Sequence, residues 1–381
     1  MSFVRHPQSP LLDHCPEALP ATAYYDAAWY AQERKTLWLN NWVSVGRVND
    51  LPMKTMRREE IAGASIILCR LASGEIKAYH NTCRHRGSEL CVKDSQPLGK
   101  LITCPYHAWS YSAADGRLVS VAHATPTDDF AKQDHGLFPV QVKLWRGFIF
   151  VKLSRDTREL APDLGLDALA NWPMEYLVTG HRMVKDLACN WKGFWDNYNE
   201  CLHCPGIHPE LCDMVPVYKQ GIMSASEAPD WQPGHGDGSN LKAGAESWTL
   251  SGKPCGPVFE GLTERERLNG YNFVTIYPTM YVVAHVDYVR SVRLMPTGPD
   301  SVRLIAEWHF PQATLDQPGF DAAEVAAFAK IVMEQDGAAS EMNQRGMRSP
   351  AFQRGTLMPQ EFDIYRFHNW VRDEMQKEVR T

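Results

Sequence analysis

Alternation between apolar and polar residues recurs in short runs of the chain and predicts two antiparallel β regions. The first region contains three such runs, at residues 64–71, 75–80 and 140–153. Gly74 lies between the first two runs and indicates a hairpin turn. The second region contains three further strand-like runs, at residues 271–286, 288–296 and 302–310. A turn is expected between its last two runs, because Thr297-Gly298-Pro299-Asp300 has turn composition.

Helical periodicity is clearest between Asp321 and Met347, where apolar or small residues recur at three- and four-residue steps. This stripe consists of Val325, Phe328, Val332, Ala339 and Met347. A second helix is expected from Asn190 to His203, ended by Pro205-Gly206. Its packed side would consist of Trp191, Phe194, Trp195, Tyr198 and Leu202. Residues 221–256, rich in Gly, Ser and Pro, are expected to form a long loop, either a lid or an insertion without a role.

Composition identifies an ordinary globular chain. It has 381 residues, of which 44% are hydrophobic and 22% charged, and this length is large for one domain. A net charge of −6 provides no basic surface, so nucleic acid is not an expected partner. We expect no membrane association and a reducing cytoplasmic location, because Met1–Pro20 lacks a signal-peptide core and no apolar run reaches roughly 18 residues. Free thiols are therefore expected at Cys15, Cys69, Cys91, Cys189, Cys212 and Cys255.

Two short motifs of cysteine and histidine lie inside the first β region. Cys83-Arg84-His85 and Cys104-Pro105-Tyr106-His107 each provide one thiolate and one imidazole. Such a set suits a two-iron, two-sulfur cluster in which one iron takes both sulfur ligands and the other takes both nitrogen ligands. The sequence therefore predicts a one-electron carrier with four ligands, Cys83, His85, Cys104 and His107.

A structural zinc ion is the alternative for these motifs, because two cysteines and two histidines also form a tetrahedral shell. Zinc fingers usually take both cysteines from one turn and both histidines from another. Here each motif supplies one of each, which favours the cluster.

With these motifs set between short strands, this part of the chain resembles the Rieske domain of the Rieske non-heme iron oxygenases, the ring-hydroxylating oxygenase family. The resemblance implies an α+β fold: an antiparallel β Rieske [2Fe-2S] domain, with both histidines partly facing solvent, followed by a helix-grip catalytic domain. We accordingly expect three segments. They are 1–39, an N-terminal helical segment packing on the catalytic domain; 40–155, the Rieske domain; and 156–381, the catalytic mononuclear iron domain.

The catalytic domain needs two histidines and one carboxylate on one face of a mononuclear Fe(II), with its other positions open for dioxygen. His203 and His208 are the expected histidines, because the segment from Asp196 to His208 resembles the one that carries the family's first two iron ligands. A helix break at Pro205-Gly206 would let both side chains face one point, which an uninterrupted helix disfavours at this spacing.

The carboxylate is expected to be Asp336, because it falls on the apolar stripe of the 321–347 helix. At about 100° per residue, Glu334 and Glu341 lie roughly 140–160° away from that stripe. A charged group on a buried face is unfavourable unless it is paired or binds a metal. The segment around Asp336 also resembles the one that supplies the family's carboxylate, although Asp336 could instead cap a neighbouring element or pair with Arg345.

Glu200 lies three residues before His203, on the same helical side, where it could accept the free ring N–H of that ligand. The resemblance implies that this residue bridges the iron site to a Rieske histidine of the neighbouring subunit and carries the electron. Many family members have Asp there, and Glu resembles the branch acting on carnitine and betaines. A solvent-facing glutamate is the alternative. Asp196 is a weaker candidate, expected to hydrogen-bond only within the helix.

Partners follow partly from what the chain lacks. It contains no G-x-G-x-x-G after a strand and no second cysteine set, so it does not take hydride from a nicotinamide by itself. A separate NAD(P)H-dependent flavin and iron–sulfur reductase is therefore expected. The resemblance also implies a homotrimer.

The substrate is indicated only by resemblance. Tyr277–Met280, His285–Tyr288 and Cys201–Pro205 resemble the branch that oxidises glycine betaine, stachydrine, carnitine or choline. A trimethylammonium group favours an aromatic cage, each face contributing ~0.5–2 kcal/mol. The cage candidates are Tyr271, Phe273, Tyr281 and His285, although aromatic residues on strands more often form core. Oxidising a methyl next to nitrogen gives a hemiaminal that loses formaldehyde, so the net reaction would be an N-demethylation.

Two alternatives remain open at this point. One is a Rieske oxygenase that hydroxylates an aromatic ring. The other, of a different class, is a Rieske electron-transfer protein with no chemistry of its own. The second predicts no mononuclear iron, and His203, His208 and Asp336 argue against it.

Overall fold

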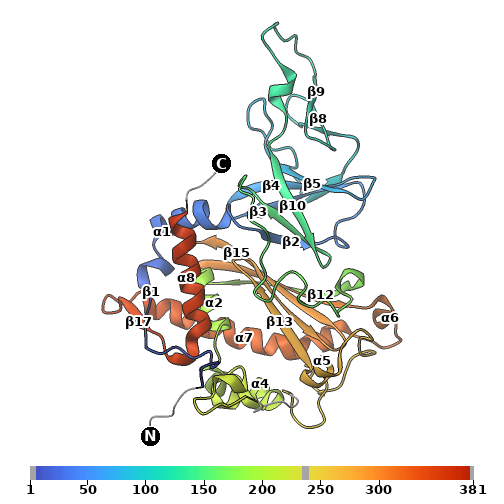
Figure 1. Ribbon diagram of the computed structural model, residues 1–381. Coiled ribbons are helices and arrows are strands. Elements are labelled where there is room, and N and C mark those ends of the chain that lie inside the picture. The colour runs from blue at the N-terminus through green and yellow to red at the C-terminus, as the bar shows by residue number, and fades with distance from the viewer. Residues whose placement is uncertain (1–5, 234–239, 378–381) are drawn as a thin grey trace. The chain divides into compact units, whose positions relative to one another are not determined.

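The computed structural model describes residues 6–233 and 240–377, and the chain divides into two compact units (Figure 1). The small unit is Arg34–Leu160, and the large unit combines the residues up to Glu33 with Ala161–Lys377. The chain passes from the large unit to the small unit after Glu33 and returns to the large unit after Leu160. The boundaries expected from the sequence for the segments 1–39, 40–155 and 156–381 lie after residues 39 and 155. The N-terminal segment thus belongs to the large unit although the small unit follows it in sequence.

Two antiparallel sheets build the small unit, one with the strand order β2-β11-β10-β5-β4-β3-β6 and one with the order β7-β8-β9. The strands are β2 Val43–Arg47, β3 Thr55–Ile61, β4 Ala64–Arg70, β5 Ile76–His80, β6 Ser95–Pro97, β7 Leu101–Thr103, β8 Trp109–Ser112, β9 Leu118–Val121, β10 Pro139–Trp145 and β11 Phe148–Lys152. Ile67 of the larger sheet and Tyr111 of the smaller one share a buried core. Cys83 and Cys104 belong to the same core, so the sheets fix the position of both cysteines.

The single strand expected at residues 140–153 is wrong, because β10 and β11 form a hairpin there. Their register runs from Gln141 opposite Lys152 to Trp145 opposite Phe148. The turn between them is Arg146-Gly147, and both residues have positive φ, at 48° and 80°. Such a turn matches the twist of a two-residue hairpin. Arginine rarely adopts positive φ, so the sequence pattern does not reveal this turn.

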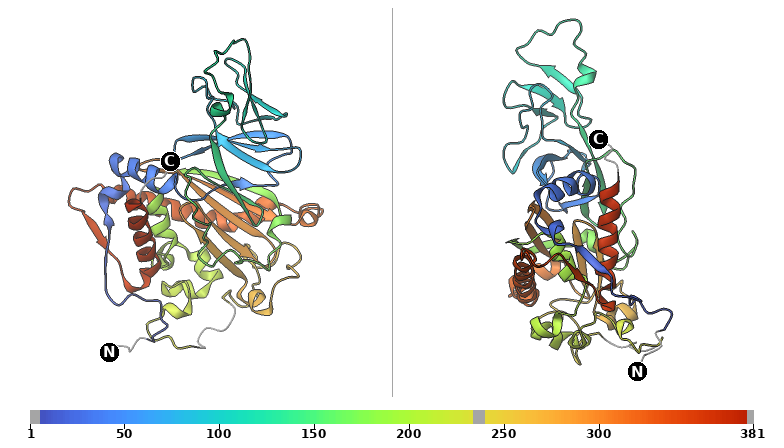
Figure 2. Two further views of the ribbon diagram at one scale, coloured as in Figure 1. Left: turned by 45° about the horizontal axis from the view of Figure 1, so that its top comes forward. Right: turned by 90° about the vertical axis from the view of Figure 1, so that its left-hand side faces the viewer.

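The large unit is centred on a five-stranded antiparallel sheet in the order β12-β16-β15-β14-β13. Its strands are β12 Val178–Leu187, β13 Tyr271–Ile276, β14 Met280–His285, β15 Val289–Gly298 and β16 Ser301–Phe310. The helices are α1 Ala27–Glu33, α2 Trp191–Tyr198, α3 Cys204–Ile207, α4 Pro209–Met214, α5 Glu264–Asn269, α6 Gln312–Leu315, α7 Ala322–Met347 and α8 Phe362–Gln376. A small separate sheet pairs β1 Glu17–Pro20 with β17 Arg354–Thr356. The long helix α7 runs along one face of the five-stranded sheet (Figure 2).

The strand expected at residues 271–286 is also two strands, β13 and β14, which pair from Tyr271 opposite His285 to Ile276 opposite Met280. Tyr277-Pro278-Thr279 forms the turn between them. All six residues of β14 are buried, and so are most of β13. Pro278 interrupts the run at this turn, as expected of a residue that cannot donate a hydrogen bond to a strand neighbour.

Helix α7 confirms the expected 321–347 helix. The side chain of Asp321 caps its start by accepting the Ala323 N–H at 2.8 Å. Val325, Phe328 and Val332 of the expected stripe are buried, which explains why this face packs inward.

A buried ion pair attaches the N-terminal segment to the rest of the large unit. Glu33 at the end of α1 lies 2.6 Å from Lys192 Nζ of α2, and neither side chain is exposed. Trp191 Nε1 donates to the other Glu33 oxygen at 2.9 Å. Both carboxylate oxygens are thus satisfied, as a buried charge requires. The pair fixes α2, which precedes the site described below.

The expected loop at 221–256 is largely irregular where the structure describes it, with one short 3₁₀ turn at Ala225–Glu227. Residues 234–239 of this prediction lie outside the described residues. Among the helices of the described ranges, none combines the length and apolar character needed to cross a membrane.

Candidate metal centres and substrate pocket

Two loops with matching backbone hydrogen bonds carry the four expected cluster ligands. In the first loop, Gly87 N donates to Cys83 O at 2.9 Å and Cys83 N donates to Ser88 O at 2.8 Å. In the second, Ala108 N donates to Cys104 O at 3.1 Å and Cys104 N donates to Trp109 O at 2.8 Å. Gly87 and Ala108 occupy the equivalent position, both with positive φ, at 78° and 56°. The two motifs are therefore folded alike.

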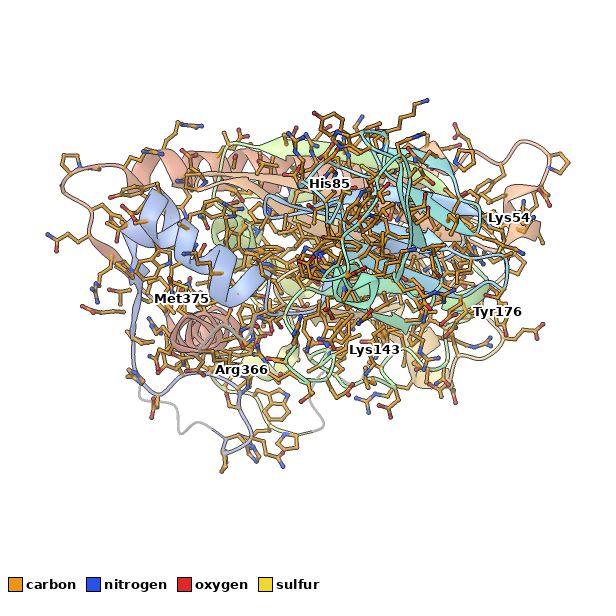
Figure 3. All side chains as sticks on the ribbon, turned by 90° about the horizontal axis from the view of Figure 1, so that it is seen from above. Lys54, His85, Lys143, Tyr176, Arg366 and Met375 are labelled. Carbon is orange, nitrogen blue, oxygen red and sulfur yellow. A yellow bond between two sulfur atoms is a disulfide. The ribbon has the colours of Figure 1, made fainter. Side chains whose placement is uncertain are left out.

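The four side chains of these loops separate into a buried pair and an outward pair. Cys83 and Cys104 are 3% and 2% exposed, whereas His107 is half-buried and His85, labelled in Figure 3, is exposed. The two imidazole rings lie 4.8 Å apart between centroids. In the described part of the chain, these four ligand atoms do not gather around a single point as they would for one ion. The arrangement suits a two-iron cluster, with sulfur ligands inside and nitrogen ligands at the surface.

Tyr111 is a cluster-loop contact that the sequence analysis missed. Its hydroxyl oxygen accepts the Arg84 N–H at 3.0 Å and lies 3.1 Å from Cys83 Sγ. Because the oxygen already accepts a hydrogen bond, its own hydrogen is available to the sulfur. A donor to a cluster thiolate stabilises negative charge there and tunes the reduction potential.

The large unit brings His203, His208 and Asp336 together. His208 Nε2 lies 2.9 Å from Asp336 Oδ1 and 3.2 Å from His203 Nε2. His203 Nε2 lies 3.4 Å from the same Asp336 oxygen. Among the described residues, these three form the one group whose ligand atoms could share a metal ion. Two imidazoles and one carboxylate with an adjoining cavity suit a mononuclear iron with open positions.

Each histidine of this group is oriented through its second ring nitrogen. His203 Nδ1 lies 2.5 Å from Glu200 Oε1, as the sequence analysis expected for a supporting carboxylate. His208 Nδ1 lies 2.8 Å from Gln335 Oε1, a contact that the sequence analysis missed. Because both Nδ1 atoms face an oxygen acceptor, both Nε2 atoms are left to point at the shared centre.

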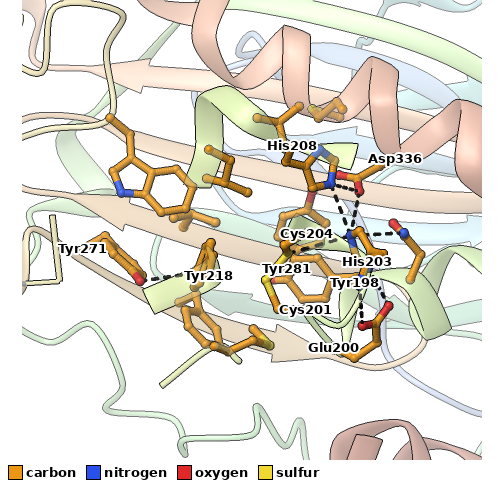
Figure 4. Close-up of a pocket in the computed structure, with 18 of the residues that line it drawn as sticks. Tyr198, Glu200, Cys201, His203, Cys204, His208, Tyr218, Tyr271, Tyr281 and Asp336 are labelled. Atoms are coloured by element: carbon orange, nitrogen blue, oxygen red, sulfur yellow. Dashed lines mark hydrogen bonds and ion pairs between the residues drawn. A yellow bond between two sulfur atoms is a disulfide. The ribbon is translucent and has the colours of Figure 1, made fainter. Parts of the chain in front are cut away.

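The local structure around the histidines differs from the expected helix. α2 ends at Tyr198, and His203 instead precedes α3, whose second residue is Pro205. Proline at the start of a helix loses no hydrogen bond, so Pro205 begins a helical turn here and does not end one. Leu202, expected on the packed side, is 40% exposed. His208 lies between α3 and α4, which returns its side chain to His203 (Figure 4).

Asp196 does not hydrogen-bond only within its helix, as the sequence analysis expected. Its Oδ2 accepts the Tyr24 hydroxyl at 2.6 Å, and its Oδ1 lies 3.0 Å from His368 Nε2. Tyr24 precedes α1 and His368 belongs to α8. Asp196 therefore connects three distant segments of the large unit.

A disulfide brackets the first iron-site histidine. Cys201 and Cys204 are bonded on either side of His203, and both are buried. The six cysteines expected as free thiols are free, as are Cys83 and Cys104.

A pocket opens beside the three metal-ligand candidates (Figure 4). Its wall includes six aromatic side chains, Tyr198, Tyr218, Trp248, Tyr271, Phe273 and Tyr281. Three of the four expected cage residues are among them, and His285 is not. His285 is 1% exposed and packs between Trp248 and Tyr288, because β14 carries it past the pocket into the core. Trp248 and Met223 of the pocket wall come from the 221–256 segment.

Cluster loops in one unit and a two-histidine, one-carboxylate site in the other define a Rieske-type non-heme iron oxygenase. The chain belongs to this family: the sequence model for the ring hydroxylating alpha subunit (catalytic domain) matches residues 174–377, more than half of it. The model for the Rieske [2Fe-2S] domain matches residues 41–132. The protein is therefore an enzyme whose cofactors are a Rieske [2Fe-2S] cluster and a mononuclear iron. The expected α+β fold, with the Rieske domain before the catalytic domain, is confirmed.

Similar proteins include several oxygenases of quaternary ammonium compounds. The glycine betaine monooxygenase oxygenase subunit of Chromohalobacter salexigens is 29% identical, over 94% of this chain and 86% of its own. The carnitine monooxygenase oxygenase subunit of Escherichia coli is 30% identical over 52% of this chain and 54% of its own. A crystal structure of the quaternary ammonium Rieske monooxygenase CntA with its substrate L-carnitine has a TM-score of 0.68 at 19% identity. It covers 95% of this chain and 96% of that one.

Proposed function

We propose that this chain is the terminal oxygenase component of a Rieske system that removes a methyl group from a small quaternary ammonium compound. The observation that carries the proposal is the pocket lined by aromatic residues that leads to His203, His208 and Asp336. Aromatic faces attract a quaternary ammonium group, each contributing ~0.5–2 kcal/mol. The names of its relatives support the same substrate class.

The residues proposed to hold the cofactors follow from the two sites. Cys83 and Cys104 would hold one iron of the cluster, and His85 and His107 the other. The mononuclear Fe(II) would be held by His203, His208 and Asp336. When bound, the cluster supplies electrons one at a time and the iron supplies the position at which dioxygen is activated.

In this reaction, one oxygen atom of O2 enters a C–H bond of an N-methyl group. The other leaves as water with two electrons and two protons. The hydroxymethyl product then breaks its C–N bond, and formaldehyde, a proton and the tertiary amine are released.

The protein's own side chains have separate parts in this chemistry. The aromatic wall orients the ammonium and excludes water from the pocket. Glu200 accepts a hydrogen bond from His203 Nδ1–H, and Gln335 accepts one from His208 Nδ1–H. These bonds hold the ring protons on Nδ1, so that both Nε2 atoms stay available to the metal. We further propose that Glu200 carries the electron from a Rieske histidine of a neighbouring subunit in a homotrimer, with its 2.5 Å contact to His203 as the last step of that route.

Electrons are proposed to come from a separate NAD(P)H-dependent flavin and iron–sulfur reductase, because the sequence carries no nicotinamide-binding motif of its own. The proposal also places the protein in the cytoplasm, where such reductants are supplied. Six cysteines that belong neither to the cluster motifs nor to the Cys201–Cys204 disulfide are free, which supports that location.

Formaldehyde release tests the proposed reaction. The purified protein with a generic ferredoxin-type reductase and NADH is offered glycine betaine, carnitine, choline and benzoate, and formaldehyde and O2 uptake are measured together. We expect one formaldehyde per O2 with at least one of the three ammonium compounds. No formaldehyde from any of them, alongside hydroxylation of benzoate, would replace the proposal with aromatic-ring hydroxylation.

A further inference from the structure

An arginine with no acidic partner among the described residues lies in the wall of the pocket. Arg290 belongs to β15, opposite Val283 of β14, and both side chains line the pocket. The arginine is only 6% exposed. Its Nε atom is buried and has no hydrogen-bond partner, and no described carboxylate forms an ion pair with it. A cation this deeply buried is unfavourable unless something compensates its charge.

Arg293, on the same strand, shows the contrast. Its guanidinium lies 3.6 Å from Glu307, a buried carboxylate that Arg182 also approaches at 3.5 Å. The fold thus provides an acidic partner for Arg293, whose side chain is 13% exposed and does not line the pocket. It provides none among the described residues for the more deeply buried Arg290.

The charge of Arg290 acts on the part of the pocket that adjoins the metal ligands. Burial raises the pKa of Tyr281 to about 12; the positive charge of Arg290 acts against this rise, and the negative charge of Asp336 adds to it. Tyr281 is therefore within electrostatic range of both Arg290 and the metal-ligand carboxylate. The positive charge of Arg290 also acts against the rise that burial causes in the pKa of Tyr198, another pocket residue.

We propose that Arg290 binds the carboxylate of the substrate, so that the enzyme selects zwitterions that carry both a quaternary ammonium group and a carboxylate. The inference rests on the proposed function and makes its substrate class narrower. The carboxylate of the bound substrate would form an ion pair with Arg290, and the aromatic side chains of the pocket wall would contact the quaternary ammonium group. Choline has the cation without the anion and would leave Arg290 unpaired.

Equilibrium binding tests this selection without electron delivery. Calorimetry on the resting holoenzyme compares glycine betaine, choline and benzoate in the wild type, in Arg290→Gln and in Arg290→Lys. We expect the wild type to bind glycine betaine at least 10-fold more tightly than choline. In Arg290→Gln, the affinity for glycine betaine should fall by about 30-fold or more, because a buried charge pair loses one partner, while choline changes little. Arg290→Lys keeps the charge and should retain part of the affinity.

Arg303→Gln is the matched control, because it removes the same charge from an exposed ion pair with Asp186 on the next strand. It should leave both affinities unchanged. Thermal unfolding provides a second readout: glycine betaine should raise the melting temperature of the wild type and of Arg303→Gln, but not of Arg290→Gln.

The outcomes separate this inference from the proposed function. Equal wild-type affinity for choline and glycine betaine, with formaldehyde released from both, would refute the role of Arg290 and leave the function standing. The same conclusion follows if Arg290→Gln binds glycine betaine like the wild type. If benzoate binds through Arg290 and is hydroxylated while no ammonium compound yields formaldehyde, the carboxylate site stands and the proposed function fails.

Discussion

At the scale of single residues, the candidate iron site depends on contacts between distant segments, since Asp336 and Gln335 of α7 both reach His208. Asp336 could be selected from the sequence because a carboxylate on the buried face of a helix requires a partner. Gln335 gave no such signal, since an amide is tolerated at the surface as well as inside. Its contact with His208 depends on two segments far apart in sequence. Arg290 was missed for a related reason, because the absence of a partner can be observed only in three dimensions.

Removing the Asp336 carboxylate should empty one metal centre and leave the other. In Asp336→Ala, we expect iron to fall from about three to about two per chain, because two imidazoles alone hold Fe(II) weakly. Elemental analysis gives the iron count, and the visible absorption of the oxidised Rieske cluster should persist. Demethylation should be lost.

Glu334→Ala is the control for that change. Glu334 lies two residues earlier on α7, is about half exposed and pairs loosely with Lys330 at 3.9 Å. It should keep the full iron content. An Asp336→Ala protein that retains its third iron would show that this residue is not a ligand.

At the scale of elements, the strand-rich regions and the long helix could be predicted from the amino-acid pattern, whereas two hairpin turns and the end of α2 were missed. Both missed turns are short: one is Arg146-Gly147 between β10 and β11, and the other is Tyr277-Pro278-Thr279 between β13 and β14. The early end of α2 was hidden because Pro205 was expected to stop a helix, whereas it starts one. Apolar patterning thus located the strand-rich regions, whereas single turn residues such as Gly147 and Pro278 marked the hairpins within them.

Two glycines of α7 should respond in opposite ways to the same substitution. A Cβ at Gly337 would lie 2.9 Å from Leu187 Cδ2 of β12, whereas a Cβ at Gly346 meets no other group within 4 Å. Gly337→Ala should therefore destabilise by about 1–3 kcal/mol through overpacking. Gly346→Ala should stabilise by roughly 0.5–1 kcal/mol, since alanine favours a helix.

Chemical denaturation of both variants measures these changes, and iron content reports their effect on the neighbouring Asp336. We expect a weakened iron site only in Gly337→Ala, because the added Cβ would crowd the Leu187 and Lys185 side chains of β12 next to Asp336. Equal stability of the two variants would contradict the close packing of α7 on the sheet.

At the scale of the whole molecule, the candidate ligands of the cluster and those of the mononuclear iron belong to different compact units. The proposed trimer predicts that electrons cross between chains. Co-expression of differently tagged Cys104→Ser and His203→Ala chains, with purification through both tags, should yield hybrids that demethylate the substrate. Each variant alone should be inactive, the first without its cluster and the second without its mononuclear iron.

One outcome of the hybrid experiment would contradict electron transfer between chains. Inactive hybrids that contain the expected iron would mean that each cluster serves the iron of its own chain. Size measurement of the unmodified protein provides the independent check on the number of subunits.

The pairing of β1 with β17 has a consequence for the synthesis of this protein on the ribosome. The chain finishes its entire small unit before the partner strand of Glu17–Pro20 is made at Arg354–Thr356. At a synthesis rate of about 5–20 residues per second, the interval between the synthesis of the two strands lasts roughly 15 to 70 s. During this interval the residues up to Glu33 have neither their strand partner nor, at first, Lys192. The strand Glu17–Pro20 therefore cannot take its place in the small sheet until nearly the whole chain has been synthesised.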